Sequence, residues 1–185
     1  NSIGNDTDLC FTAGVLSVVK GILLENISSI QGLLNAYGIS EKIFEEKIRQ
    51  LSRMEVVEIQ LDKVACISDQ CLSNYMLYYV FVERKLMPLS TLMEIGFPEF
   101  PAAVSRSIST IYTLFQEQEV HEYCEHEILK AWDFFKAQGS SCYEHFVKVF
   151  KHFRPEEAIL LAQKNIEDTD LQNAGSYSLD LLKDF

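Results

Sequence analysis

The sequence contains no apolar run long enough to cross a membrane. Its apolar stretches, such as Met76 to Val82, are far shorter than the roughly 20 residues that a membrane-spanning helix requires. We therefore exclude a transmembrane helix. The chain has 185 residues, of which 48% are hydrophobic, and its mean hydropathy is +0.02. It is long enough for one full core or for two small modules packed together.

Basic residues are scarce. The chain has 16 Lys and Arg residues against 27 Asp and Glu residues, which gives a formal net charge of −11 and a pI near 4.8. Proteins that bind nucleic acid gain much of their affinity by neutralising phosphates with basic side chains. The charge balance therefore makes nucleic acid an unfavourable partner.

The sequence also lacks paired cysteine motifs. Its five cysteines are odd in number and show no CxxC spacing, which is typical of reduced thiols in a cytoplasmic protein. A disulfide between Cys66 and Cys71 is disfavoured, because the first lies in an expected hairpin and the second in the next helix. No signal peptide is recognisable. Because the chain begins with Asn1 rather than Met, we expect it to be part of a longer protein.

No known nucleotide-binding or catalytic loop is present, since GxxxxGK[ST], GxGxxG and GxSxG are all absent. The segment His121 to His126 does contain ligand types that zinc accepts. A zincin helix, however, needs two histidines four residues apart, and Glu125 stands four residues after His121. Although His121, Cys124 and Glu125 could share a helix face, we expect a mixed polar face rather than a metal site.

Cys142, His145 and His152 are the nearest approach to a nucleophile with its base. No third residue is placed to orient either histidine, and the segment has the pattern of an amphipathic helix rich in phenylalanine. We expect both histidines to lie in the core or at its boundary. The sequence thus predicts no catalytic, cofactor-binding or metal-binding residue, and the chain itself is not expected to be an enzyme.

Two short amphipathic helices are predicted near the start of the chain. The first ends at Gly38, a natural helix stop, and the second begins after Ser40, a favourable N-cap. The apolar residues at helical spacing are Ile27, Ile30, Leu33 and Leu34 in the first helix, and Ile43, Phe44, Ile48 and Leu51 in the second.

A β-hairpin is predicted after the second helix. Apolar and polar residues alternate from Val56 to Leu61, and the apolar run Val64 to Ile67 follows a short turn. Ser68 and Asp69 then offer N-caps for another helix. Two helices followed by a hairpin form the outline of a winged helix, here over residues 25–69.

A mostly apolar helix is expected before this module. It extends from Leu9 to Leu23 and is weakened by Gly14 and Gly21, while Asn1 to Asp8 is expected to be frayed. This lead-in segment, residues 1–24, fits the first helix of the winged-helix core.

Residues 70–185 are predicted to form an antiparallel helical bundle or a helical-repeat array. The chain is thus expected to be mainly α, with a winged-helix module that contains a small β-hairpin, followed by these helices. Ser141 with Glu144 matches a capping box, and a polar tail from Asp168 to Ser178 leads to a further helix that starts near Tyr177. The other expected helices are Gln70 to Lys85, Leu89 to Ile95, Ala102 to Gln116, Glu119 to Ala137, Cys142 to His152 and Pro155 to Ile166.

The charges on the predicted module distinguish two kinds of partner. A DNA reader would expose basic and amide side chains on its second helix and a basic residue at the hairpin tip. Here that helix mixes acidic and basic residues, and acidic residues surround Lys63 in the hairpin. We therefore expect a protein contact, with Glu45, Arg49 and Arg53 as the contact surface. A DNA-binding winged-helix regulator is the alternative.

The segment Ile43 to Phe100 resembles the winged-helix region that follows the ATPase core in STAND-type (AAA+-like, P-loop) signal-transduction NTPases. The resemblance rests on the helix and hairpin, on Ser68 to Tyr75, and on Phe97 to Phe100. It implies that a nucleotide-binding domain precedes this chain and that the helices from Ala102 onward begin a sensor or repeat region. The chain would then be a non-catalytic regulatory fragment of a larger multidomain protein. A scaffold of the PCI type is disfavoured, because it places its winged helix after its helices.

Overall fold

The structure is a computed structural model that describes residues 3–139 and 141–167. These residues are mainly helical with one small antiparallel sheet, which confirms the predicted fold class at this level. No helix in the described residues is both long and apolar enough to span a membrane. The elements in chain order are η1 (Ile3–Asn5), α1 (Thr7–Val19), β1 (Ile22–Leu23), η2 (Leu24–Ile30), α2 (Gln31–Tyr37), α3 (Glu41–Arg53), β2 (Val57–Gln60), β3 (Val64–Ile67), α4 (Gln70–Tyr78), η3 (Tyr79–Glu83), α5 (Leu89–Glu99), α6 (Pro101–Leu114), α7 (Gln118–Gln138), α8 (Cys142–Phe150), η4 (Lys151–Phe153) and α9 (Pro155–Glu167).

The chain divides into two compact units, Asn1–Glu127 and Ile128–Phe185. The first unit contains the sheet, helices α1 to α6 and the first half of α7. The predicted domain boundaries at residues 24 and 69 both fall inside this unit.

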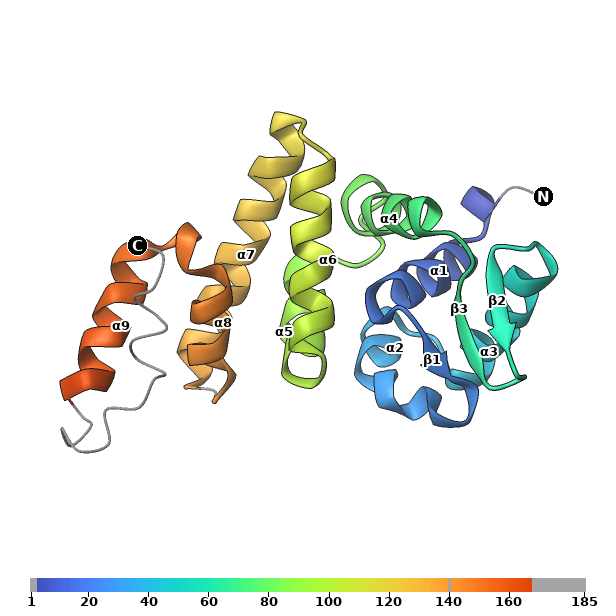
Figure 1. Cartoon of the computed structure of the whole chain (residues 1–185), viewed down its shortest axis with the longest axis horizontal. Helices are drawn as coiled ribbons and strands as arrows, with labels where there is room; N and C mark the ends of the chain where they lie inside the picture. Colours follow the sequence, from blue (N-terminus) through green and yellow to red (C-terminus); the bar gives the residue numbers. More distant parts are fainter. Residues whose placement is uncertain (1–2, 140, 168–185) are drawn as a thin grey trace. The chain divides into compact units, whose positions relative to one another are not determined.

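Helix α1 forms much of the core of the first unit, where it packs against α3, α4 and α6 (Figure 1). Its residues from Leu9 to Val18 are all buried, as expected for a helix that is apolar on most sides. The predicted helix is too long at its C-terminal end, because α1 stops at Val19. It also begins earlier than predicted, since the Asp6 carboxylate caps it by accepting a hydrogen bond from the Leu9 amide at 2.9 Å.

Gly14 allows the close approach of α1 to the π-helical turn η3. A Cβ atom at Gly14 would lie 2.7 Å from Cγ1 of Val80, so a larger residue would push the two elements apart. The glycine that weakens the helix in isolation therefore fits the packing in the folded protein.

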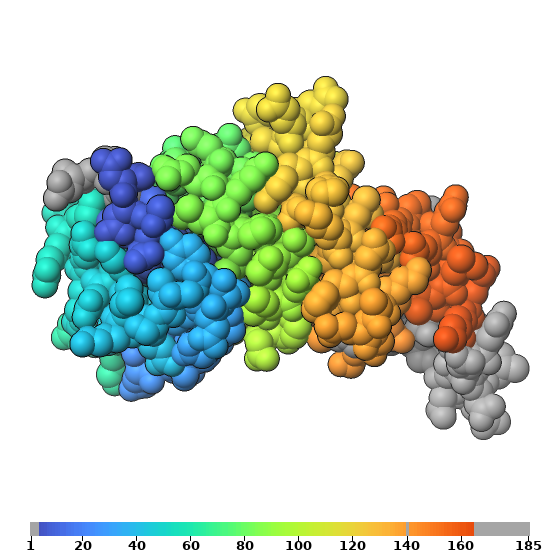
Figure 2. Space-filling view, turned by 180° about the vertical axis from the view of Figure 1, so that it is seen from behind, coloured from blue at the N-terminus to red at the C-terminus, as the bar shows by residue number. Residues whose placement is uncertain are grey.

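The first short helix of the predicted module is in fact two elements. The 3₁₀ segment η2 contains a kink at Asn26, and only α2 is a regular α-helix. Gly38 ends α2 with a φ of +93°, as predicted. The Tyr37 ring at the end of α2 stacks on Phe11 of α1, with ring centroids 3.8 Å apart. Figure 2 shows the light-blue surface of residues 20–40 beside the green surface of later helices, in agreement with the packing of α2 on α5.

Helix α3 and the hairpin are confirmed. Ser40 caps α3 by accepting a hydrogen bond from the Ile43 amide at 3.3 Å, and β2 pairs antiparallel with β3. The sheet also contains a strand that the pattern did not predict. Ile22 and Leu23, expected to be helical, form β1 and pair with Ala65 and Val64, which gives the strand order β1-β3-β2 (Figure 1).

Helix α4 begins as predicted, because the Asp69 carboxylate accepts a hydrogen bond from the Leu72 amide at 2.8 Å. The helical path continues through the π-helical turn η3 and ends at Glu83, so the predicted helix to Lys85 is two residues too long. The wider turn of η3 was not predicted. Helix α5 extends past its predicted end to Glu99 and includes Pro98, while α6 starts at Pro101.

The first half of α7 is fixed to the N-terminus of α5. The buried Glu127 carboxylate accepts hydrogen bonds from the amide and the hydroxyl of Ser90, at 3.1 and 2.6 Å. The Tyr123 hydroxyl donates to the carbonyl of Phe81 at 3.1 Å, and the Lys85 ammonium lies 4.3 Å from the centre of the Tyr123 ring. Side chains on α7 thus satisfy amides that the first turn of α5 leaves without helical partners.

The second unit has an aromatic core in which Trp132 and Phe135 of α7 pack against Phe146 of α8. Arg154 joins η4 to α7 through two hydrogen bonds to Asp133, of 2.5 and 3.1 Å. Helix α8 begins near the predicted residue, but the predicted capping box is wrong, because the Ser141 side chain makes no capping hydrogen bond. The predicted polar tail and the helix near Tyr177 lie outside the described residues.

Candidate functional site

The outward side of α3 carries the predicted contact surface. One stripe of the helix, made of Phe44, Ile48 and Leu51, is fully buried, so the opposite side faces solvent. This separation follows from the strongly amphipathic sequence of α3. It leaves Arg49 and Arg53 exposed and Glu45 half-buried.

Glu45 and Arg49 come together as an ion pair. The Arg49 guanidinium donates two hydrogen bonds to Oε1 of Glu45, at 2.7 and 3.2 Å, across one turn of the helix. Arg53 lies one turn further along. Within the described residues it forms no ion pair with a carboxylate. The contact surface therefore presents one neutralised pair and one arginine whose charge is open to solvent.

The hairpin turn, Leu61 to Lys63, carries one apolar, one acidic and one basic side chain. Leu61 is 91% exposed there, and both Leu61 and Asp62 have positive φ angles of 51° and 56°. The neighbouring Lys63 is exposed, and so is Glu58 on β2. Exposed apolar side chains also occur at Leu23 on β1, at 43%, and at Ile43 on α3, at 38%. The module thus shows solvent a mixture of apolar and charge-balanced groups.

The His121 to His126 segment lies on α7 near its start. The His121 ring stacks on Tyr112 with centroids 4.1 Å apart, and its Nε2 lies 2.9 Å from the Tyr112 carbonyl. Cys124 is completely buried, and burial raises the pKa of its thiol to about 12. In residues 3–139 and 141–167, no three His, Cys, Asp or Glu side chains are grouped as a metal site requires.

The other candidate group lies on α8 and η4. His145 and His152 are both exposed, so the expectation that they lie in or beside the core is wrong for their side chains. Cys142 is half-buried at the start of α8. Each of the five cysteines is a thiol rather than half of a disulfide.

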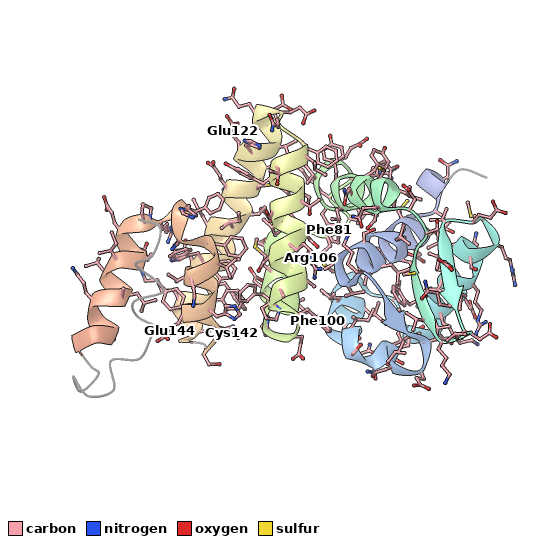
Figure 3. The ribbon with its side chains drawn as sticks, viewed as in Figure 1. Phe81, Phe100, Arg106, Glu122, Cys142 and Glu144 are labelled. Carbon is pink, nitrogen blue, oxygen red and sulfur yellow. The ribbon has the colours of Figure 1, made fainter. Side chains whose placement is uncertain are left out.

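A second candidate site was not predicted from the sequence. Lys20 and Arg106, from the end of α1 and from α6, line one cavity together with residues of β3 and α4. Figure 3 labels Arg106 on the side of α6 toward α1. One local signal was present, namely a charged residue directly before Gly21 at a helix end. Nothing in the pattern indicated that α6 returns to this point.

Comparison of the chain with protein-family models, with curated proteins and with solved structures found no match. The assignment of a role to either site therefore depends on its own geometry.

Proposed function

We propose that the chain is a non-catalytic regulatory part of a larger protein and that it makes its contacts with protein through a winged-helix module. The order α1, β1, α2, α3, β2, β3 and the sheet order β1-β3-β2 support a winged helix. In this proposal the helices from α4 onward belong to an antiparallel bundle or repeat array that acts as a sensor. The module couples that sensor to a nucleotide-binding domain upstream.

We favour a protein partner because of the charged and apolar side chains that α3 and the hairpin expose. The Glu45 carboxylate already neutralises Arg49, and in the hairpin turn the one basic residue, Lys63, follows Asp62 and the exposed Leu61. Phosphate binding would require cations that are free to replace the counterions of the nucleic acid. A protein partner, in contrast, can use an exposed arginine together with exposed apolar side chains, a composition that is common in protein interfaces.

A salt titration tests the choice between protein and DNA. The affinity of the chain for random duplex DNA is measured by gel shift at 50 and 200 mM salt. A DNA reader with six to ten phosphate contacts loses roughly 10³ to 10⁵ in affinity over this range. We expect no shifted band at either salt concentration. A band that weakens steeply with salt would instead support the DNA-binding alternative.

Charge reversal tests the contact surface itself. Arg49→Glu and Arg53→Glu are made in the full-length protein, and its nucleotide turnover and its assembly state are measured. We expect either variant to change turnover or assembly, because each places a negative charge in a protein contact. Lys164→Glu on α9 is the matched control, since it reverses an exposed charge on the second unit. Wild-type turnover and assembly in both α3 variants would show that this surface makes no such contact.

A further inference from the structure

A cavity of about 380 Å³ lies within the first unit, between α1, β3, α4 and α6. Its volume is within the range of pockets that hold small molecules, roughly 300–1,000 Å³. Buried Leu16 and half-buried Ile67 supply its apolar wall. Its remaining lining residues are Lys20, Cys66, Asp69, Gln70, Ser73, Arg106 and Thr110.

Lys20, one of the residues that line this cavity, has an unfavourable backbone conformation. It follows the last residue of α1 with a φ of +64°, in the left-handed region that favours glycine. Gly21 is the next residue, yet its φ is not positive. A non-glycine residue in this conformation costs roughly 1–2 kcal/mol. The conformation has a structural role, because it ends α1 as a left-handed C-cap in which the Lys20 amide donates to the Leu16 carbonyl at 2.9 Å.

The Lys20 side chain points to the polar part of the cavity. Its ammonium donates a hydrogen bond to Oγ of Ser73, at 3.0 Å, and Ser73 is only 4% exposed. Thr110 adds a second hydroxyl to the lining. A cation and two hydroxyl groups are thus present in one concave site.

Arg106 adds a second positive charge to the same cavity. Among the described residues, neither Lys20 nor Arg106 forms an ion pair with a carboxylate. Asp69 also lines the cavity, and one oxygen of its carboxylate caps α4, so the lining holds two cationic side chains and one carboxylate. Burial and, after it, the charge of Arg106 lower the pKa of Lys20. This is an unusual arrangement for a chain whose net charge is −11.

We propose that this cavity binds the phosphate group of a small organic molecule between Lys20 and Arg106, with the hydroxyls of Ser73 and Thr110 as further hydrogen-bond partners. A phosphate would relieve the repulsion between two cations that have no carboxylate partner. Its geometry suits the planar guanidinium of Arg106 and the point charge of Lys20. The apolar wall at Leu16 and Ile67 would contact the organic part of the molecule. This site is separate from the α3 surface and does not depend on the role proposed for it.

Calorimetric titration of the chain tests the proposal with three probes at one ionic strength: inorganic phosphate, pyrophosphate and glycerol 3-phosphate. We expect binding of at least one phosphate probe, with no heat from glycerol or from added chloride. Lys20→Asn and Arg106→Gln should each weaken this binding roughly tenfold or more, because each removes a charge-assisted hydrogen bond. Asparagine tolerates the left-handed conformation, so the first variant should keep its fold.

Lys164→Gln is the matched control, because it removes an exposed positive charge from α9 in the second unit. It should bind the probe with the wild-type affinity. Thermal melting without ligand checks that each variant is folded before it is titrated. The proposal is overturned if no phosphate probe binds the wild-type chain. It is also overturned if folded Lys20→Asn and Arg106→Gln bind as tightly as the control.

Discussion

The ammonium of Lys47 on α3 lies 2.6 Å from Oδ2 of Asp6, whose other carboxylate oxygen caps α1. One carboxylate therefore completes the N-terminus of α1 and also joins this helix to α3. The hydrogen bond from Lys47 is the main reason that the pKa of Asp6 is lowered, and the hydrogen bond from the Leu9 amide acts in the same direction. The segment before α1, expected to be frayed, thus includes a residue that connects two helices.

The Asp6 contacts predict a loss of stability in acid. Because the folded-state pKa of Asp6 is lowered, its contribution is present above about pH 3.8, the ordinary value, and is lost as the pH falls through the folded-state value. Asp6→Asn should cost about 0.5–1 kcal/mol at pH 7, since solvent screens a carboxylate that is 35% exposed. Asp6→Ala should cost about 1 kcal/mol more, because it also removes the cap.

Urea unfolding at pH 7 and in strong acid measures both effects. The difference between wild type and Asp6→Asn should shrink as the pH falls. An equal difference at both pH values would mean that the ionised carboxylate contributes nothing.

The contact between Gly14 and Val80 predicts the effect of a small enlargement. Gly14→Ala places a Cβ atom 2.7 Å from Cγ1 of Val80, so it should destabilise the protein by about 1–3 kcal/mol through overpacking. Gly21→Ala is the matched control, because its Cβ would meet no atom closer than 3.5 Å. Thermal or urea unfolding of both variants measures the difference. Equal stabilities would mean that α1 can move away from η3 at little cost.

The buried Glu127 predicts a strong coupling between α7 and α5. Glu127→Ala should cost about 1–3 kcal/mol or more, because the amide and hydroxyl of Ser90 lose an acceptor in a site where Glu127 is only 2% exposed. A double-mutant cycle with Ser90→Ala, followed by urea unfolding, separates the hydroxyl contact from the amide contact. Purely additive losses would show that the hydroxyl of Ser90 gains nothing from this carboxylate.

The conformation of Lys20 predicts a variant that is more stable than the natural sequence. Lys20→Gly removes the strain of a φ of +64°, which costs roughly 1–2 kcal/mol, but it also removes the hydrogen bond to Oγ of Ser73, which contributes about 0.5–1.5 kcal/mol. It should therefore stabilise the first unit by about 0.5 kcal/mol. Differential scanning calorimetry without phosphate measures the change. A lower melting temperature would indicate that the packing of the lysine side chain outweighs the strain of its backbone.

Thiol reactivity should follow burial. Cys71 is exposed, whereas Cys10 and Cys124 are buried, and burial raises the pKa of both buried thiols. At pH 8, iodoacetamide should therefore modify Cys71 first and leave Cys10 and Cys124 unmodified until the protein unfolds. Mass spectrometry of tryptic peptides follows each site with time. Early modification of Cys124 would show that the start of α7 opens readily.

The sequence predicted the elements whose signals are local. Ser40 and Asp69 cap the helices that follow them, Gly38 ends α2, and the alternation after Val56 marks the hairpin. These signals depend on neighbouring residues, so the pattern alone contains them. The α3 surface could be predicted in the same way, since the spacing of Glu45, Arg49 and Arg53 places them on one side of a helix.

The features that were missed depend on contacts between distant segments. Two apolar residues, Ile22 and Leu23, continue the pattern of the preceding helix, and only their pairing with β3 makes them a strand. The cavity with Lys20 and Arg106 forms only when α6 returns to the end of α1. Neither relationship leaves a periodic signal in the sequence, because each is determined by tertiary packing rather than by local propensity.

The pairing of β1 with β3 also affects the order in which the strands of the sheet come together. Hairpins close within about 1–10 μs because their strands are neighbours in sequence, whereas β1 reaches β3 only by closing a loop that contains η2, α2, α3 and β2. During synthesis, Ile22 and Leu23 leave the ribosome well before Val64 and Ala65 exist to pair with them. We therefore expect the third strand to join the sheet after the hairpin has closed. Until the hairpin is complete, a nascent chain carries two apolar residues without strand partners.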